Sequence, residues 1–246
     1  MNSGVRLGCG LAGIRSLPRA SVGMIFADLP SGQTQAEFDK PINLLEFWDS
    51  AWHALHPKGN VVLMASSLGF AAQVIASNRP FFRYDLIWSK SAATGFLNAK
   101  KRPLRAHEFI LIFSKEAGAT YNRQMMEGGS PIHFARRKQH SENYGAITAP
   151  SLSRAGATDR HPVSVLEFAS LGTSSKQRRH PQQKPVPLLR WLIRTYSNHG
   201  DTVVDPCAGS GSFLEAGSVE GRKPVGWDIN LRFGSPDATP LSIYSS

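Results

Sequence analysis

The sequence predicts an α/β protein with an open, mostly parallel sheet, and three segments carry this prediction. Residues 203–213 combine a β-branched run, an acid and a glycine-rich bend. Before them, residues 185–196 place apolar side chains at helical spacing behind two prolines, which suit a first helical turn. After them, residues 224–228 form a short strand that also ends in an acid. This order of helix, strand, bend and strand is typical of sheets that bind a ligand beyond the C-terminal ends of their strands.

Two glycines shape the bend that follows Asp205. Gly209 and Gly211 permit backbone conformations that bring the chain close to a ligand. The segment matches neither the dinucleotide fingerprint nor a phosphate-binding P-loop, because no Gly-Lys-Ser/Thr follows it. Taken alone, it is also compatible with an ordinary strand-to-helix turn. A carboxylate at Asp228, where the next strand ends, can accept hydrogen bonds from ribose hydroxyls.

The N-terminal half continues the α/β pattern. Residues 22–26 form a strand that ends just before Asp28. Residues 35–56 contain apolar side chains at helical spacing, and Pro57-Lys58-Gly59 is expected to close that helix. We expect three more strands and one more helix, at residues 60–64, 83–88 and 109–113 and at residues 68–75, respectively. Between the last two strands, residues 94–104 form a long basic loop.

Three blocks in residues 180–228 together resemble the cofactor-binding half of the DNA amino-methyltransferases. They are His-Pro-x-x-Lys-Pro from His180, Asp-Pro-x-x-Gly-Ser-Gly from Asp205, and Gly-Arg-x-x-x-Gly-x-Asp from Gly221. Their order and spacing make this match more specific than any single block. The resemblance implies a Rossmann-like class I methyltransferase fold that uses S-adenosylmethionine to methylate exocyclic amines of adenine or cytosine in DNA. It assigns cofactor binding to Lys184, Pro185, Asp205, Pro206, Cys207, Gly209, Ser210, Gly211 and Asp228.

The same family carries a catalytic tetrapeptide, usually Asp-Pro-Pro-Tyr, at the end of another strand. Here the N-terminal strand ends in Asp28-Leu29-Pro30-Ser31, so the resemblance implies that these four residues are catalytic. Because they precede the cofactor block, the motif order is the permuted, β-type one. An exocyclic amine is a poor nucleophile, since its lone pair is delocalised into the ring. A carboxylate and a backbone carbonyl that each accept one amine hydrogen would direct that lone pair at the methyl group.

Two positions depart from the family pattern. Ser31 replaces the aromatic residue that stacks on a base swung out of the duplex, an interaction worth about 1–3 kcal/mol. Cys9 stands where the family often has an acid near the cofactor's adenine. We expect Phe96 either to supply the missing ring or to pack as a hinge or core residue. No cysteine nucleophile is expected, because neither Cys9 nor Cys207 has a histidine-based activation pattern.

The charge distribution favours a nucleic-acid partner. The formal net charge is +10, and basic residues are concentrated in segments 79–105, Lys90 among them, and 115–180. Both segments lie between the catalytic and cofactor blocks, where the resemblance places DNA contacts. Neutralising phosphates with such residues makes affinity depend on salt. We expect double-stranded DNA as the partner, with a homodimer as a further option, and DNA contacts from Phe96, Lys100, Lys101, Arg102, Arg136, Arg137 and Lys138.

Composition sets the expected domain organisation and location. Residues 1–114 and 180–246 should form the catalytic methyltransferase domain, and residues 115–179 a basic, loop-rich target-recognition insertion. No run of about 18 apolar residues is present, so no membrane span is expected. The two cysteines favour a reducing compartment, and we expect the cytoplasm. The histidines lack zinc-binding spacing, and no metal is expected.

Several interpretations of the activity remain open from the residues alone. Adenine is favoured because the tetrapeptide begins with Asp28, whereas cytosine-amine enzymes more often begin with Ser. Cytosine is the first alternative. The second is a relative that binds DNA without turnover, which Ser31 and Cys9 favour. RNA or a protein amide as the target is the third, although the basic insertion argues against a protein substrate.

Overall fold

The computed structural model describes residues 4–32, 41–128, 130, 140–141, 145–146, 157–171 and 183–230. The chain divides into two compact units, residues 1–122 with 164–246 and residues 123–163. The second unit contains the short strands β6 (His140–Ser141) and β7 (Gly145–Ala146) and an isolated bridge between Met126 and Arg160. None of the described helices is both long enough and apolar enough to cross a bilayer.

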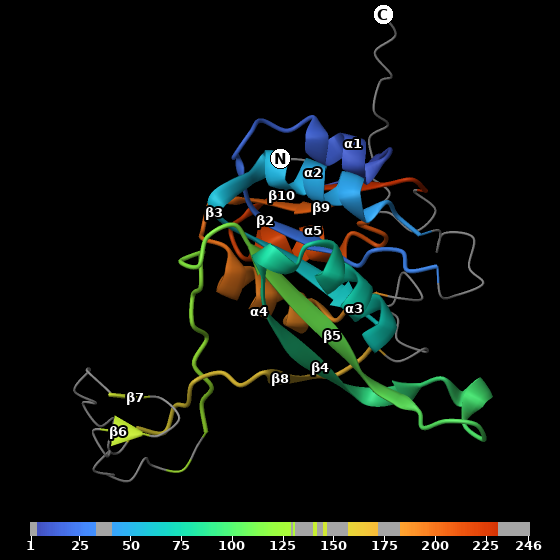
Figure 1. Cartoon of the computed structure of the whole chain (residues 1–246), viewed down its shortest axis with the longest axis vertical. Helices are drawn as coiled ribbons and strands as arrows, with labels where there is room; N and C mark the ends of the chain where they lie inside the picture. The colour runs from blue at the N-terminus through green and yellow to red at the C-terminus, as the bar shows by residue number, and fades with distance from the viewer. Residues whose placement is uncertain are drawn as a thin grey trace, which may run out of the picture. The chain divides into compact units, whose positions relative to one another are not determined.

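An eight-stranded sheet forms the centre of the first unit (Figure 1). Across the sheet, the strands follow the order β1 (Val5–Leu7), β10 (Lys223–Asp228), β9 (Thr202–Asp205), β2 (Val22–Ala27), β3 (Leu55–Ala65), β5 (Arg105–Ser114), β4 (Phe82–Thr94) and β8 (Val165–Phe168). The strands from β1 to β3 are parallel, β5 runs antiparallel to both β3 and β4, and β8 is parallel to β4. The predicted mostly parallel α/β sheet is confirmed.

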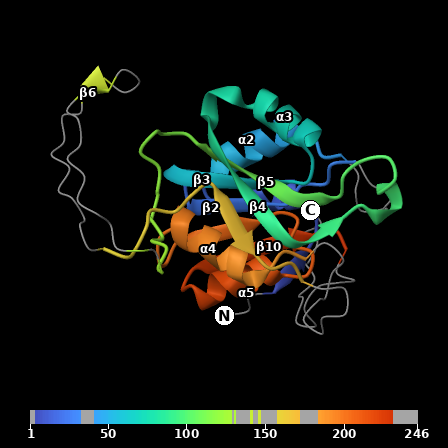
Figure 2. The same ribbon diagram turned by 90° about the horizontal axis from the view of Figure 1, so that it is seen from below.

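Alternating apolar side chains give the sheet two buried faces. Met24 and Phe26 of β2 pack on one face, whereas Ile25 and Ala27 pack on the other. The first face is covered by α4 (Val186–Tyr196) and α5 (Ser212–Val219), and the second by α1 (Gly10–Arg15), α2 (Leu44–Ala54) and α3 (Leu68–Ser77). Figure 2 shows α2 and α3 on one side of the sheet and α4 and α5 on the other. Cover on both faces explains why the central strands are apolar almost throughout.

Helix α2 is shorter than the expected helix 35–56. Its N-cap is Asn43, whose side-chain oxygen accepts hydrogen bonds from the backbone N–H groups of Leu45 and Glu46 at 3.0 and 3.3 Å. Residues 33–40 lie outside the described residues. Pro57-Lys58-Gly59 was wrongly expected to end the helix, because β3 begins directly after α2 and includes these residues. In the eight-stranded sheet and the α-helices that cover it, β1, α1, α5 and β8 were not predicted, since none exceeds eight residues and so short a segment shows little periodicity.

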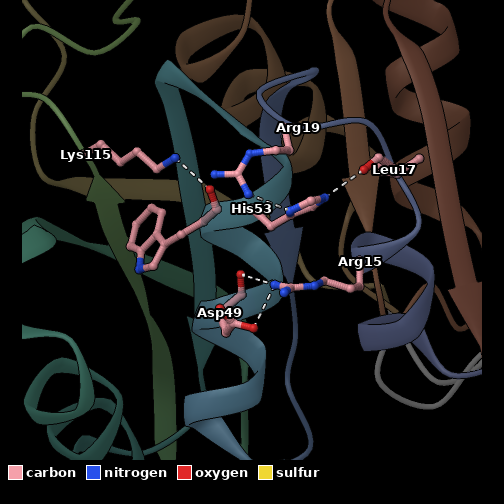
Figure 3. A network of polar contacts seen from close by, with 7 residues as sticks. Arg15, Leu17, Arg19, Asp49, His53 and Lys115 are labelled. Atoms are coloured by element: carbon pink, nitrogen blue, oxygen red, sulfur yellow. Dashed lines mark hydrogen bonds and ion pairs between the residues drawn. The ribbon is translucent and has the colours of Figure 1, made fainter.

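Polar contacts connect α2 with α1 and with Lys115 (Figure 3). Arg15, at the end of α1, donates from Nη1 to the Asp49 carboxylate at 2.7 Å. Lys115 donates from Nζ to the Trp52 carbonyl oxygen at 2.7 Å and thereby satisfies an acceptor near the end of α2. Burial lowers the pKa of Lys115. Arg15 and Lys115 thus both contact α2.

Strands β4 and β5 extend beyond their neighbours as a two-stranded arm, defined here as residues 91–105 (Figure 1). Thr94 pairs with Arg105 near its end, and a 3₁₀ turn at Phe96–Asn98 forms the tip. Gly95 opens that turn with a φ of 95°, in the left-handed region that favours glycine. The expected basic loop 94–104 is therefore the tip of a hairpin.

Candidate active site

The C-terminal ends of β2 and β9 open into one large cavity. The two strands are hydrogen-bonded parallel neighbours, so Asp28 and Asp205 come to the same edge of the sheet. Both residues line the cavity, which has a volume of about 1040 Å³. Small-molecule sites usually measure about 300–1,000 Å³. The cavity therefore offers room for more than one small ligand.

Most of the predicted site residues line this cavity. They are Asp28, Leu29, Pro30, Ser31, Phe96, Lys184, Asp205, Pro206, Cys207, Gly209, Ser210 and Asp228. Two predicted cofactor residues do not line it: Pro185 is the N-cap of α4, and Gly211 is the N-cap of α5. Lys100, Lys101 and Arg102 are exposed at the tip of the arm, and Arg136, Arg137 and Lys138 lie outside the described residues.

Two carboxylates hold the glycine-rich loop 205–211 in shape. Gly209 N–H donates to Asp228 Oδ2 at 2.8 Å, and Cys207 N–H donates to Asp205 Oδ1 at 2.9 Å. Gly209 and Gly211 adopt φ values of 48° and 75°, which a side chain would disfavour. Because an ionised carboxylate has about four lone-pair positions, Asp228 can accept further hydrogen bonds from a ligand.

The chemistry of this loop fits the methyl donor that the resemblance implies. S-adenosylmethionine carries a sulfonium cation and two ribose hydroxyl donors. Asp205 and Asp228 supply acceptors at the wall of the cavity, and the glycines leave the loop backbone uncovered by side chains. The residues in place would therefore suit a cationic nucleoside.

Asp205 itself is 3% exposed. Burial, and to a lesser extent the negative charges of Asp28 and Asp228, raise its pKa to about 8, although the hydrogen bond from the Cys207 N–H opposes them. Asp205 thus interacts with two other acidic side chains, Asp28 and Asp228, within one site.

Replacing Asp205 with asparagine should flatten the dependence of stability on pH. In the unfolded chain this carboxyl ionises near pH 4, whereas in the folded protein it keeps its proton up to about pH 8. The contribution of the protonated Asp205 carboxyl to the free energy of unfolding is therefore complete below the pKa of the unfolded chain. It is lost as pH rises through the pKa of the folded protein. Urea unfolding at about pH 4 and about pH 9 should show that the free energy of unfolding falls more between these two pH values in the wild type than in Asp205→Asn. Equal losses in the two proteins would contradict a buried, protonated Asp205.

Asp28 belongs to a buried ionic cluster that was not predicted from the sequence. Lys184 Nζ lies 2.7 Å from Asp28 Oδ2 and 3.2 Å from Glu108 Oε2. Glu108 Oε1 in turn lies 2.5 Å from Lys90 Nζ. Although burial opposes it, the two carboxylates raise the pKa of Lys184. Although burial favours the neutral acid, Lys184 and Lys90 lower the pKa of Glu108.

Sequence reasoning misplaced one member of this cluster and missed another. Lys90 was counted with the basic surface, yet its side chain is 9% exposed and pairs with Glu108. Glu108 was not considered as a site residue, although it directly precedes the apolar run of residues 109–113. An acid at that position is a weak signal, because strand ends often carry charged residues. Only the pairing of β4 with β5, which sets Trp88 opposite Glu108, reveals its burial.

Comparisons with known proteins agree with this architecture. A family model described as DNA methylase, for the N6/N4 methyltransferases, matches residues 23–234. DNA adenine methyltransferase YhdJ of Escherichia coli (strain K12) is 26% identical over 247 residues, which cover 92% of this chain and 78% of that protein. Among solved structures, PvuII DNA methyltransferase (cytosine-N4-specific) superposes with a TM-score of 0.63 at 18% identity and covers 91% of this chain and 80% of its own. The M1.HpyAVI–SAM complex superposes with a TM-score of 0.58 at 19% identity, and the match covers 93% of this chain and 94% of the M1.HpyAVI chain.

The two structural likenesses confirm the Rossmann-like methyltransferase fold. The family model spans most of the chain and includes both the strand that ends at Asp28 and the loop 205–211. The chain therefore belongs to the family of DNA methylases that transfer a methyl group from S-adenosylmethionine to the exocyclic amine of adenine or cytosine.

Proposed function

We propose that this chain methylates the exocyclic amine of adenine in DNA, at the cavity where β2 and β9 end. One observation carries the proposal: Asp28 and the loop 205–211 face the same cavity from adjacent parallel strands. A carboxylate suited to an amine is thereby placed beside a loop suited to the methyl donor. The aspartate that begins the tetrapeptide, and the likeness to a relative named as an adenine methyltransferase, favour adenine over cytosine.

The residues of the tetrapeptide 28–31 prepare the amine in this proposal. Asp28 accepts one amine hydrogen, and a backbone carbonyl of the tetrapeptide accepts the other. These two hydrogen bonds favour a pyramidal nitrogen, whose lone pair is then free to take the methyl group. When bound, S-adenosylmethionine supplies that methyl group on a positively charged sulfur. Positioning and electrostatics account for most of the rate gain, because no covalent intermediate with the protein is needed.

We assign the cofactor to the loop 205–211 and to Asp228. The M1.HpyAVI structure, solved as a complex with SAM, supports a cofactor site in this fold. Pro185 keeps its predicted cofactor role only through the resemblance, since it does not line the cavity. Lys184 lines the cavity, but its ammonium group already contacts two carboxylates.

The arm supplies the DNA-contacting surface in this proposal. Phe96 is 71% exposed and also borders the cavity, so its ring can reach a base swung out of the duplex. Lys100, Lys101 and Arg102 follow at the exposed tip, where they can neutralise backbone phosphates. Target recognition by the insertion 115–179 belongs to the same proposal.

Replacing Phe96 with alanine should slow methyl transfer roughly 5- to 150-fold, which corresponds to the loss of about 1–3 kcal/mol of base stacking. Ser31 cannot supply that stacking, so Phe96 is expected to carry it. The matched control is Leu97→Ala, because Leu97 is fully exposed beside Phe96 but does not border the cavity. Single-turnover transfer rates on a duplex substrate make the comparison. Equal rates in the two variants would remove Phe96 from this role.

One assay tests the proposed function directly. The protein is incubated with labelled S-adenosylmethionine and unmethylated double-stranded DNA, and the product is digested to nucleosides. Labelled methyladenine supports the proposal. Labelled methylcytosine would instead identify cytosine, the alternative target, as the base that is methylated. Tight DNA binding without label would identify a relative that has lost turnover, the candidate that the serine at position 31 favours.

A further inference from the structure

Three charged side chains stand in line behind Asp28, and each comes from a different element. Lys184 precedes Pro185, the N-cap of α4, whereas Glu108 belongs to β5 and Lys90 belongs to β4. Their side chains are 10%, 8% and 9% exposed, against 28% for Asp28. Buried charges are costly unless they are paired. The charges of two ammonium groups and two carboxylates balance here. Ion pairs connect Lys90 to Glu108, Glu108 to Lys184, and Lys184 to Asp28.

The cluster is built on rigid parts of the fold. Trp88 lies opposite Glu108 in the β4–β5 pairing, and Lys90 Nζ lies 5.3 Å from the centre of the Trp88 ring. Trp88 also donates from Nε1 to the Phe168 carbonyl oxygen of β8 at 2.9 Å. Glu108 is therefore held from two sides, and it offers Lys184 a fixed anchor. Side chains supported in this way keep a site within the narrow tolerances that catalysis requires.

The contact with Lys184 limits what the Asp28 carboxylate can do. Because Lys184 Nζ lies 2.7 Å from Oδ2, a charge-assisted contact restrains the orientation of the carboxylate. Asp205 lies close enough to Asp28 for the two acidic groups to interact. The positive charge of Lys184 lies directly at the carboxylate that must accept the amine hydrogen.

We infer that Lys184 and Glu108 are positioning residues for methyl transfer. Lys184 orients the Asp28 carboxylate and pairs with it, Glu108 anchors Lys184, and Lys90 secures Glu108. This inference rests on the proposed catalytic role of Asp28. It gives Lys184 a function different from the cofactor contact that the His-Pro-x-x-Lys-Pro block implies.

The test compares Lys184→Met and Glu108→Gln with the control Lys223→Met, which removes an exposed lysine at the start of β10. Single-turnover methyl transfer should fall roughly 10- to 100-fold in Lys184→Met, while the Kd for S-adenosylmethionine from calorimetry stays within about twofold. The Kd also reports whether each variant folds. Glu108→Gln should slow transfer less, and the double variant should be no slower than Lys184→Met, because both act through one carboxylate. Lys184→Arg should recover part of the rate, since it retains the charge.

Three results would overturn the inference. A Kd for S-adenosylmethionine that rises in step with the loss of rate would make Lys184 a cofactor ligand instead. Multiplicative losses in the double variant would show that Lys184 and Glu108 act independently. The third result does not depend on turnover: a double-mutant cycle of urea unfolding on Asp28→Asn and Lys184→Met that shows no coupling would exclude the pairing. A wild-type protein that binds cofactor but transfers no methyl group defeats the proposed function, and the unfolding cycle still judges the pairing.

Discussion

Replacing Asp28 with asparagine is expected to slow methyl transfer roughly a thousandfold and to leave DNA affinity within a few-fold of wild type. Asparagine keeps the shape of the side chain, but it removes the negative charge and turns one acceptor into a donor. That donor would face either the amine hydrogens or the Lys184 ammonium group, which lies 2.7 Å from the present oxygen. Burst measurements with labelled S-adenosylmethionine report the transfer step, and fluorescence anisotropy reports DNA binding.

Asp49→Asn is the matched control for this substitution. Asp49 is an exposed carboxylate on α2 that pairs with Arg15 and does not border the cavity. A surface ion pair contributes little, about 0–1 kcal/mol, so transfer should be unchanged in this variant. If Asp28→Asn turned over as fast as Asp49→Asn, Asp28 would lose its assigned part in the reaction.

Replacing Gly10 with alanine is expected to weaken cofactor binding at least roughly tenfold and to lower the free energy of unfolding by about 1–3 kcal/mol. A Cβ at Gly10 would lie 2.0 Å from the carbonyl oxygen and 2.7 Å from the Cα of Pro206. Both are backbone atoms, which cannot swing aside as a flexible side chain does. Either α1 or the loop 205–211 must therefore move, and the loop is the segment assigned to the cofactor.

Gly69→Ala provides the comparison for Gly10→Ala. Gly69 lies near the start of α3, and an added Cβ would meet nothing within 4 Å. Alanine favours helix over glycine by about 1 kcal/mol or less at such a position, so this variant should be neutral or slightly stabilised. Calorimetric titration with S-adenosylmethionine and urea unfolding measure both variants. An unchanged Kd in Gly10→Ala would show that the close approach of α1 does not set the shape of the loop.

The strands and helices that carry the motifs were predictable because their signals are local. The strand at residues 22–26 and the strand at 224–228 were expected within one residue of β2 and β10. The helix at 68–75 corresponds to α3. Prediction failed at residues 57–59, where proline and glycine normally end a helix, because α2 already ends at Ala54. Residues 57–59 lie instead in the register shift of β3, between the residues that pair with Val22 and with Met24 of β2.

The sequence by itself determined the family and the two segments that form the site, because each motif is a short run whose residues set the local backbone conformation. Asp28 ends a strand, and Gly209 and Gly211 permit left-handed turns, whatever surrounds them. The tertiary structure alone decided that Lys184 contacts Asp28 rather than solvent, and that Lys90 and Glu108 stand behind it. Those four residues come from distant parts of the chain, and their charges are ordinary until the packed sheet excludes water from them.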